Sequence, residues 1–101
     1  KNLIEKIDYF NSQMKNYLDN PIIEKCDFSI EGCAIKFNSN NTDTEVSLIL
    51  QDYSPDEFDS LYVTWEFYIH NIKHDEYLDS RFFSRSDTAI KYFLSKIKYM
   101  T

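Results

Sequence analysis

Two histidines near the start of the last third of the chain are candidates for a metal site. His70 and His74 are four residues apart, and Asp75 and Glu76 follow. On a helix this spacing would place both imidazoles on one face, as zinc sites require. The alternating pattern instead predicts that His70 ends a strand and that His74 lies in a turn. No Glu directly follows His70, so the zinc-protease pattern is not met. We expect exposed turn histidines and no metal site.

The two cysteines, Cys26 and Cys33, offer a possible nucleophile. Alternation places both on the apolar side of adjacent strands, where cysteine behaves as a small buried hydrophobe. A reactive thiol needs a basic partner and access to solvent, and nothing in the sequence supplies them. Two cysteines do not make a disulfide framework, so we expect both to be reduced and unbridged. Since no serine sits in a tight glycine turn either, we expect no catalytic residue and no cofactor.

Carboxylates and tyrosines in the middle of the chain indicate binding rather than catalysis. The acids between Pro55 and Ser60 lie in a polar loop, whereas a hydrolase needs a carboxyl group in an apolar pocket. Tyrosine offers rigid amphipathic contact area, and carboxylates pair with a partner's Arg or Lys. An alternative stays open, in which the tyrosines only cover the sheet. The residues predicted to bind a partner are Asp52, Tyr53, Asp56, Glu57, Asp59, Tyr62, Glu66 and Tyr68.

Charge is distributed unevenly along the 101 residues, whose net charge is −6. Between Lys36 and Lys73 there are seven acids and no Lys or Arg, whereas the chain is basic from Arg81 onward. Binding to nucleic acid requires cationic side chains, so this composition argues against a DNA or RNA ligand. The acidic stretch is expected either to meet a basic partner or simply to keep the protein soluble.

Length and hydropathy bound the organisation of the chain. A chain of 101 residues has the size of one domain, so we expect a single domain over 1–101. The apolar runs are too short to span a membrane, and no segment reads as a signal peptide. We therefore expect a cytoplasmic monomer that does not bind membranes.

Periodicity predicts a helix, a series of antiparallel strands and a second helix. The helices are expected over 3–19 and after Ser84 or Ser86, which would cap the second one. The strands are expected within 25–30, 33–37, 45–51 and 61–70, with a possible short fifth strand over 77–82. A turn at Glu31-Gly32 would pair Ile30 with Cys33, Phe28 with Ile35, and Cys26 with Phe37.

The strand over 61–70 decides how these elements pack. It alternates between an apolar set that includes Val63, Trp65 and Phe67 and a polar set that includes Tyr62 and Tyr68. Two amphipathic helices need one shared apolar surface. We therefore predict a two-layer α+β sandwich with a four- to five-stranded antiparallel sheet and both helices on one of its faces. The other face would remain open.

This organisation resembles that of bacterial immunity proteins, most of all those of contact-dependent growth inhibition systems. The resemblance covers the chain from KNLIEKIDYFNSQM through CDFSIEGCAIKF and LYVTWEFYIH to SRSDTAIKYFLSKI. It implies a non-enzymatic protein that binds and inhibits one cognate toxin domain, often a basic nuclease, and it transfers no site residues. The alternatives are an acidic nucleic-acid mimic or adaptor that binds a basic protein, and a small enzyme or ligand-binding domain.

Overall fold

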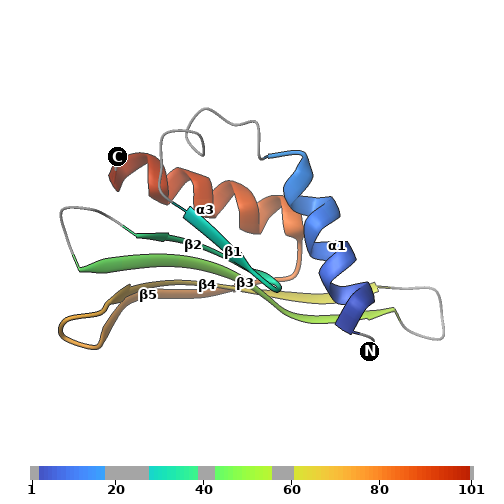
Figure 1. Ribbon diagram of the computed structural model, residues 1–101, viewed down its shortest axis with the longest axis horizontal. Helices are drawn as coiled ribbons and strands as arrows, with labels where there is room; N and C mark the ends of the chain where they lie inside the picture. The colour runs from blue at the N-terminus through green and yellow to red at the C-terminus, as the bar shows by residue number, and fades with distance from the viewer. Residues whose placement is uncertain (1–2, 18–27, 39–42, 56–60, 101) are drawn as a thin grey trace.

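The structure, a computed structural model, describes residues 3–17, 28–38, 43–55 and 61–100. Along the chain, one helix comes before the five strands and the other follows them (Figure 1). The elements are α1 (Leu3–Lys15), β1 (Phe28–Glu31), β2 (Ala34–Asn38), β3 (Thr44–Pro55), β4 (Leu61–Asn71), β5 (Glu76–Phe83) and α3 (Ser86–Met100). The fifth strand, which the sequence left open, is therefore present, and it is longer than expected.

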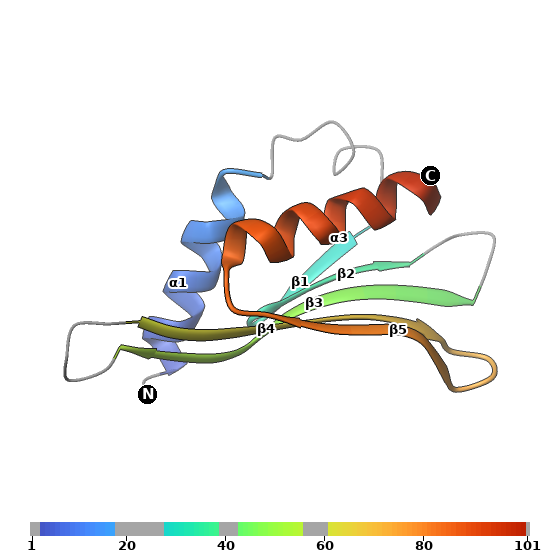
Figure 2. The ribbon, with the colours of Figure 1, turned by 180° about the vertical axis from the view of Figure 1, so that it is seen from behind.

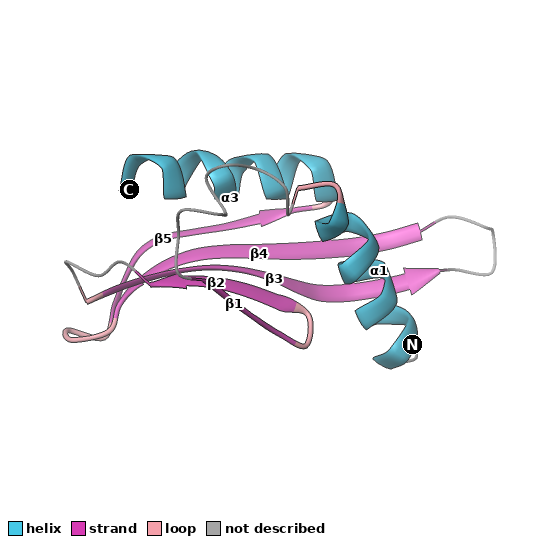
Figure 3. Ribbon diagram, turned by 45° about the horizontal axis from the view of Figure 1, so that its top comes forward, coloured by secondary structure: helices cyan, strands magenta, loops and turns pink. Residues whose placement is uncertain are grey.

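The five strands form one antiparallel sheet in the order β1-β2-β3-β4-β5, so each strand pairs with its neighbours in the sequence. Figures 1 and 2 show both helices on the same face of this sheet. In Figure 3, α3 runs along the sheet, while α1 crosses it near one end. The predicted two-layer α+β sandwich is confirmed. None of the helices in the described part of the chain is both long and apolar enough to cross a membrane.

The core lies between the helices and the inner face of the sheet, which is the face that they cover. Trp65 of β4 is fully buried, and its ring centroid lies 5.8 Å from that of Phe10 on α1. Phe67 of the same strand meets Phe93 of α3 at 6.4 Å in an edge-on arrangement. Trp65 is a core residue, as predicted. Burial of each such side chain contributes on the order of 1.5–3 kcal/mol to stability.

The start of α3 differs from the expected serine cap. The Ser86 hydroxyl donates to Gln13 Oε1 of α1 at 2.5 Å, so it joins the two helices. In the first turn the carboxylate of Asp87 accepts from the backbone N–H of Thr88 at 2.8 Å. The guanidinium of Arg85 also donates to Asp87, and this bond is the main reason why the pKa of the Asp87 carboxyl falls to about 2. The carboxylate of Asp87, rather than a serine hydroxyl, therefore accepts a backbone hydrogen bond at the start of this helix.

The register of the first hairpin also differs from the prediction. Gly32 and Cys33 form its turn, so Phe28 lies opposite Phe37 and Ile30 opposite Ile35. Gly32 has a φ of +59°, and two-residue hairpin turns favour glycine where φ is positive. The predicted turn began one residue too early. Each residue of β1 therefore pairs with a residue two positions further along β2 than predicted. A shift of two residues leaves the two faces of a strand unchanged.

Cys33 consequently lies in a turn rather than within a strand. It is unbridged and partly buried, and this burial raises the pKa of its thiol. Its backbone carbonyl accepts from the N–H of Leu50 in β3 at 2.8 Å. Cys26, which we also predicted to be reduced and unbridged, lies outside the described residues.

A β-bulge interrupts β3 where the sequence predicted plain alternation. Leu50 lies opposite Trp65, but the next pair is Asp52 with Thr64, so Gln51 is an extra residue. A bulge of one residue exchanges the faces of all positions that follow it. The strand also continues to Pro55, beyond the predicted end at residue 51.

Candidate partner-binding face

The sheet face opposite the helices, here called the outer face, carries the candidate site. It is reached by side chains that alternate with the buried inner set along β2 to β5. Its described members are Ala34, Lys36, Asn38, Glu45, Ser47, Ile49, Asp52, Ser54, Tyr62, Thr64, Glu66, Tyr68, His70, Tyr77, Ser80 and Phe82. Figure 2 shows that no described helix covers it.

Four of the predicted partner-binding residues lie on the outer face: Asp52, Tyr62, Glu66 and Tyr68. The side chain of Tyr62 is 59% exposed, whereas Glu66 and Tyr68 are half-buried. Asp56, Glu57 and Asp59 lie outside the described residues.

Tyr53, which we also predicted to bind a partner, does not lie on the outer face. Because of the bulge at Gln51, Tyr53 lies opposite Val63, which is a core residue. Its ring packs on that of Tyr9 in α1, with the centroids 4.6 Å apart. Tyr53 is therefore part of the contact between helix and sheet.

A shallow depression, here called the aromatic cup, occupies the outer face over β3, β4 and β5. It has a volume of about 530 Å³ and is lined by Ile49, Glu66, Tyr68, Tyr77 and Ser80. The register explains the cluster, because Ile49 is opposite Glu66, and Tyr68 is opposite Ser80. The cup thus combines one apolar side chain, two phenol rings, a hydroxyl and one carboxylate.

Contacts on both sides hold Tyr77 in place at the rim of the cup. Its ring meets that of Tyr68 edge-on, with centroids 5.5 Å apart and planes at 76°. On its other side it stacks on the imidazole of His70 at 4.5 Å and 19°. His70 Nε2 is in turn 2.9 Å from Asp75 Oδ1. Tyr77 is 61% exposed, so a rigid ring is presented to solvent.

The two histidines do not form a shared site. His70 contacts Tyr77 and Asp75, whereas the backbone N–H of His74 donates to Asn71 Oδ1 within the turn. Among the residues whose placement is described, no group of three or more His, Cys, Asp or Glu side chains could hold a metal ion.

Glu66 is positioned by an uncharged neighbour. Gln51 Nε2 donates to Glu66 Oε1 at 2.5 Å, and Gln51 is the extra residue of the bulge. Within residues 3–17, 28–38, 43–55 and 61–100, no Lys, Arg or His forms an ion pair with this carboxylate. Its negative charge therefore faces the cup without a described cation to neutralise it.

Sequence reasoning missed three contributors to the outer face, namely Ile49, Tyr77 and Phe82. Ile49 was visible as an apolar residue in a polar set, which is a weak signal. Tyr77 and Phe82 lie in the segment whose alternation was unclear. The register of β5 shifts between Tyr77, which is opposite His70, and Asp79, which is opposite Ile69. Phe82 is 64% exposed and lies opposite Glu66, so it extends the aromatic surface beyond the cup.

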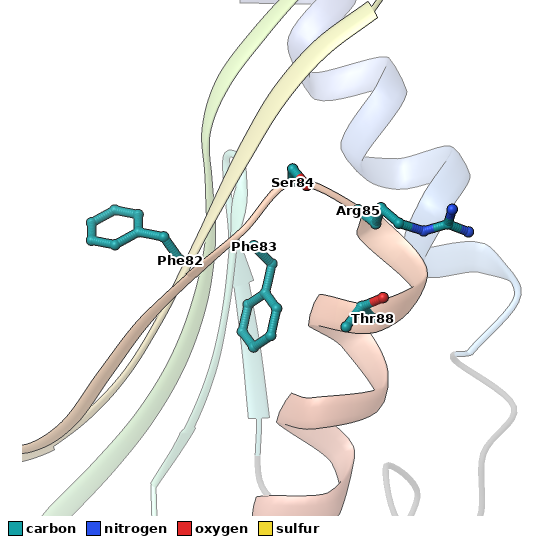
Figure 4. A pocket seen from close by; sticks show the side chains of 5 residues that line it. All are labelled: Phe82, Phe83, Ser84, Arg85 and Thr88. Atoms are coloured by element: carbon teal, nitrogen blue, oxygen red, sulfur yellow. The ribbon is translucent and has the colours of Figure 1, made fainter.

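A second pocket, of about 290 Å³, lies where β5 leads into α3. Figure 4 shows its lining, with Phe82 and Phe83 on opposite sides of the strand and Thr88 on the helix. Its one charged group, Arg85, is bound by Asp87 at 3.1 and 3.0 Å. This pocket therefore presents a guanidinium that already has a partner.

On the inner face β5 carries a polar cluster of Asp79 and Arg81 beside the apolar Phe83. The Tyr92 hydroxyl of α3 donates to Asp79 Oδ2 at 2.9 Å, and the guanidinium of Arg81 lies 5.0 Å from the centre of the Tyr92 ring. Burial raises the pKa of the Asp79 carboxyl, but the bond from Tyr92 and the charge of Arg81 outweigh it and lower the pKa overall. The cluster joins α3 to the edge of the sheet.

Comparison with models of known protein families, with curated proteins and with solved structures finds no match to this chain. Its chemistry is thus inferred from its own residues. The outer face offers exposed aromatic rings and carboxylates, a combination that suits contact with a cationic protein surface.

Proposed function

We propose that this chain is an immunity-type inhibitor that binds one basic toxin domain through the outer face of its sheet. The observation that carries the proposal is the set of aromatic side chains on a face that no described helix covers. Tyr62, Tyr77 and Phe82 are each more than half exposed there. Exposed aromatic side chains gathered on one face mark interaction sites, because tyrosine and other aromatics supply much of the contact energy in interfaces.

Charge supports a basic partner. Asp52 and Glu66 share the outer face with these rings, and the sequence between Lys36 and Lys73 contains seven acids and no Lys or Arg. Acidic residues at an interface accelerate the encounter with a cationic surface and exclude anionic ones. A nuclease domain is a fitting target, because its own substrate-binding surface has to be cationic.

The proposal is tested with the domain encoded by the open reading frame directly upstream of the gene for this chain. We expect expression of that domain alone to arrest growth, and co-expression of this chain to restore it. The two purified proteins should form a complex with one copy of each. A domain that is harmless, or that this chain neither binds nor neutralises, would contradict the proposal.

Two pairs of variants test the surface. Tyr62→Ala should raise the dissociation rate about tenfold or more, as loss of an aromatic anchor does. Tyr99→Ala is its control, because Tyr99 is exposed on α3. Asp52→Asn should slow association and weaken the dependence of association on salt. Asp8→Asn removes the same charge from an exposed position of α1, so it should change neither. If Tyr62→Ala and Asp52→Asn bind and protect like the wild type, the interface lies on another surface.

A further inference from the structure

We infer that the aromatic cup is a receptor for a single arginine side chain of the partner. The inference rests on the proposed function for the existence of a partner, and it adds the chemistry of the contact. The cup is open to solvent, and a protruding side chain can enter it from outside. Its lining residues come from three adjacent strands, so the hydrogen-bonded ladder fixes their relative positions.

The charge of the occupant follows from Glu66. This carboxylate lines the cup, and its described hydrogen-bond partner is the neutral amide of Gln51 at 2.5 Å. That bond orients the carboxylate without neutralising it. A cation that enters the cup would therefore meet a pre-positioned negative charge, and a charge-assisted hydrogen bond is about twice as strong as a neutral one.

The shape of the occupant follows from the two phenol rings. Tyr68 and Tyr77 stand nearly perpendicular to one another, and His70 supports Tyr77 from behind. A flat guanidinium can stack on one ring while its N–H fork reaches a carboxylate, whereas a lysine ammonium is a compact and strongly hydrated point charge. The apolar side chain of Ile49 suits the methylene stem of an arginine. The combination favours arginine over lysine.

The test uses a blocked tripeptide, acetyl-Gly-Arg-Gly-amide, and amide chemical shifts of the isotopically labelled protein. We expect saturable shifts concentrated at the lining residues, with a dissociation constant on the order of millimolar for so small a ligand. The matching peptide with citrulline has nearly the same shape and no charge. It should bind at least about fivefold more weakly, and the lysine peptide should also bind more weakly than the arginine peptide.

Protein variants localise the contact. Glu66→Gln, which preserves the shape of the side chain, should weaken binding of the arginine peptide about threefold or more. Glu5→Gln removes the same charge from the exposed side of α1, away from the outer face, and should leave binding unchanged. Tyr77→Ala should also weaken binding, with Tyr99→Ala as its control.

Three results would overturn the inference: shifts that do not saturate, equal binding of the arginine and citrulline peptides, or wild-type affinity in Glu66→Gln. None of them involves the toxin domain. The peptide experiment can therefore fail while this chain still neutralises its partner, and loss of neutralisation would leave the peptide result intact.

Discussion

The ammonium of Lys6 on α1 donates to the backbone carbonyl of Gln51 at a distance of 3.0 Å. Gln51 is the extra residue of the β3 bulge, and such a residue is left out of the regular ladder of the sheet. Lys6 thus joins α1 to the backbone of the bulge. The side-chain amide of the same residue holds Glu66 on the outer face. One bulge therefore links the packing of α1 to the geometry of the candidate site.

The bulge predicts opposite roles for two tyrosines that straight alternation would place together. Tyr53→Ala should lower the free energy of unfolding by about 1–3 kcal/mol, because the ring packs on Tyr9. Tyr62→Ala should change it by less than about 0.5 kcal/mol, since the side chain is mostly exposed. Urea denaturation of both variants measures the difference. Equal effects would mean that the two rings share one face.

The bond between Tyr92 and Asp79 should make stability depend on pH. Tyr92→Phe keeps the ring and removes the hydroxyl, which should cost about 0.5–1.5 kcal/mol at neutral pH. In the folded protein the pKa of Asp79 lies below its ordinary value of 3.8. Its contribution is therefore fully present above about pH 4 and is lost as the pH falls through the lower, folded-state pKa.

The difference between wild type and Tyr92→Phe should consequently shrink below about pH 4. Denaturation midpoints from pH 7 down to pH 2 measure this. Asp87, whose pKa is about 2, titrates in both proteins and cancels in the comparison. Tyr99→Phe serves as the control. A difference that stays constant over the whole range would show that the Tyr92 hydroxyl does not act through the ionised carboxylate.

Trp65 should be the most costly single residue of the sheet to truncate. It is fully buried and contacts Phe10, so Trp65→Ala should destabilise the protein by about 3–5 kcal/mol. Tyr99→Ala is a suitable comparison, because Tyr99 is 89% exposed and its loss leaves no cavity. Chemical denaturation gives both values. A Trp65→Ala protein within about 1 kcal/mol of wild type would mean that the sheet faces are inverted.

Gly32 offers a test of the corrected hairpin register. Its φ is +59°, and a Cβ atom added there would meet no other atom within 4 Å. The cost of Gly32→Ala should therefore come from the backbone alone, at about 1–2 kcal/mol. Gly32→Asn should cost less, because asparagine tolerates this conformation better. Thermal unfolding compares the two. Equal stability of wild type and Gly32→Ala would argue against the turn at Gly32-Cys33.

Much of the fold could be predicted, because long stretches of the chain alternate or repeat without interruption. The ten residues from Leu61 to His70 identify both the strand β4 and its buried face, and Trp65 and Phe67 lie where that pattern puts them. The apolar stripe of α3, which includes Ile90, Phe93 and Ile97, is equally regular and equally buried. A regular pattern of apolar residues predicts the buried face of a helix or strand wherever that face packs against the core.

The predictions of strand faces fail where one extra residue shifts the alternation of a strand. Alternation cannot reveal that Gln51 is left out of the ladder, and the side-chain face of Tyr53 was reversed as a result. In β5 the inner face carries Asp79 and Arg81, whose polarity is satisfied by Tyr92 from α3. That partner is distant in the sequence, so β5 looked irregular, and Tyr77 was not recognised as part of the aromatic cup.

The order of the strands has a consequence for how the chain folds. Each strand pairs only with its neighbours in the sequence, so the sheet can grow by successive hairpins, each closed by a local loop. Such short-range contacts favour rapid folding compared with sheets that join distant segments. One long-range step is the docking of α1 onto β3 and α3, where Lys6, Tyr9 and Gln13 make their contacts. Substitutions at these three positions should therefore speed unfolding more than they slow the assembly of the sheet.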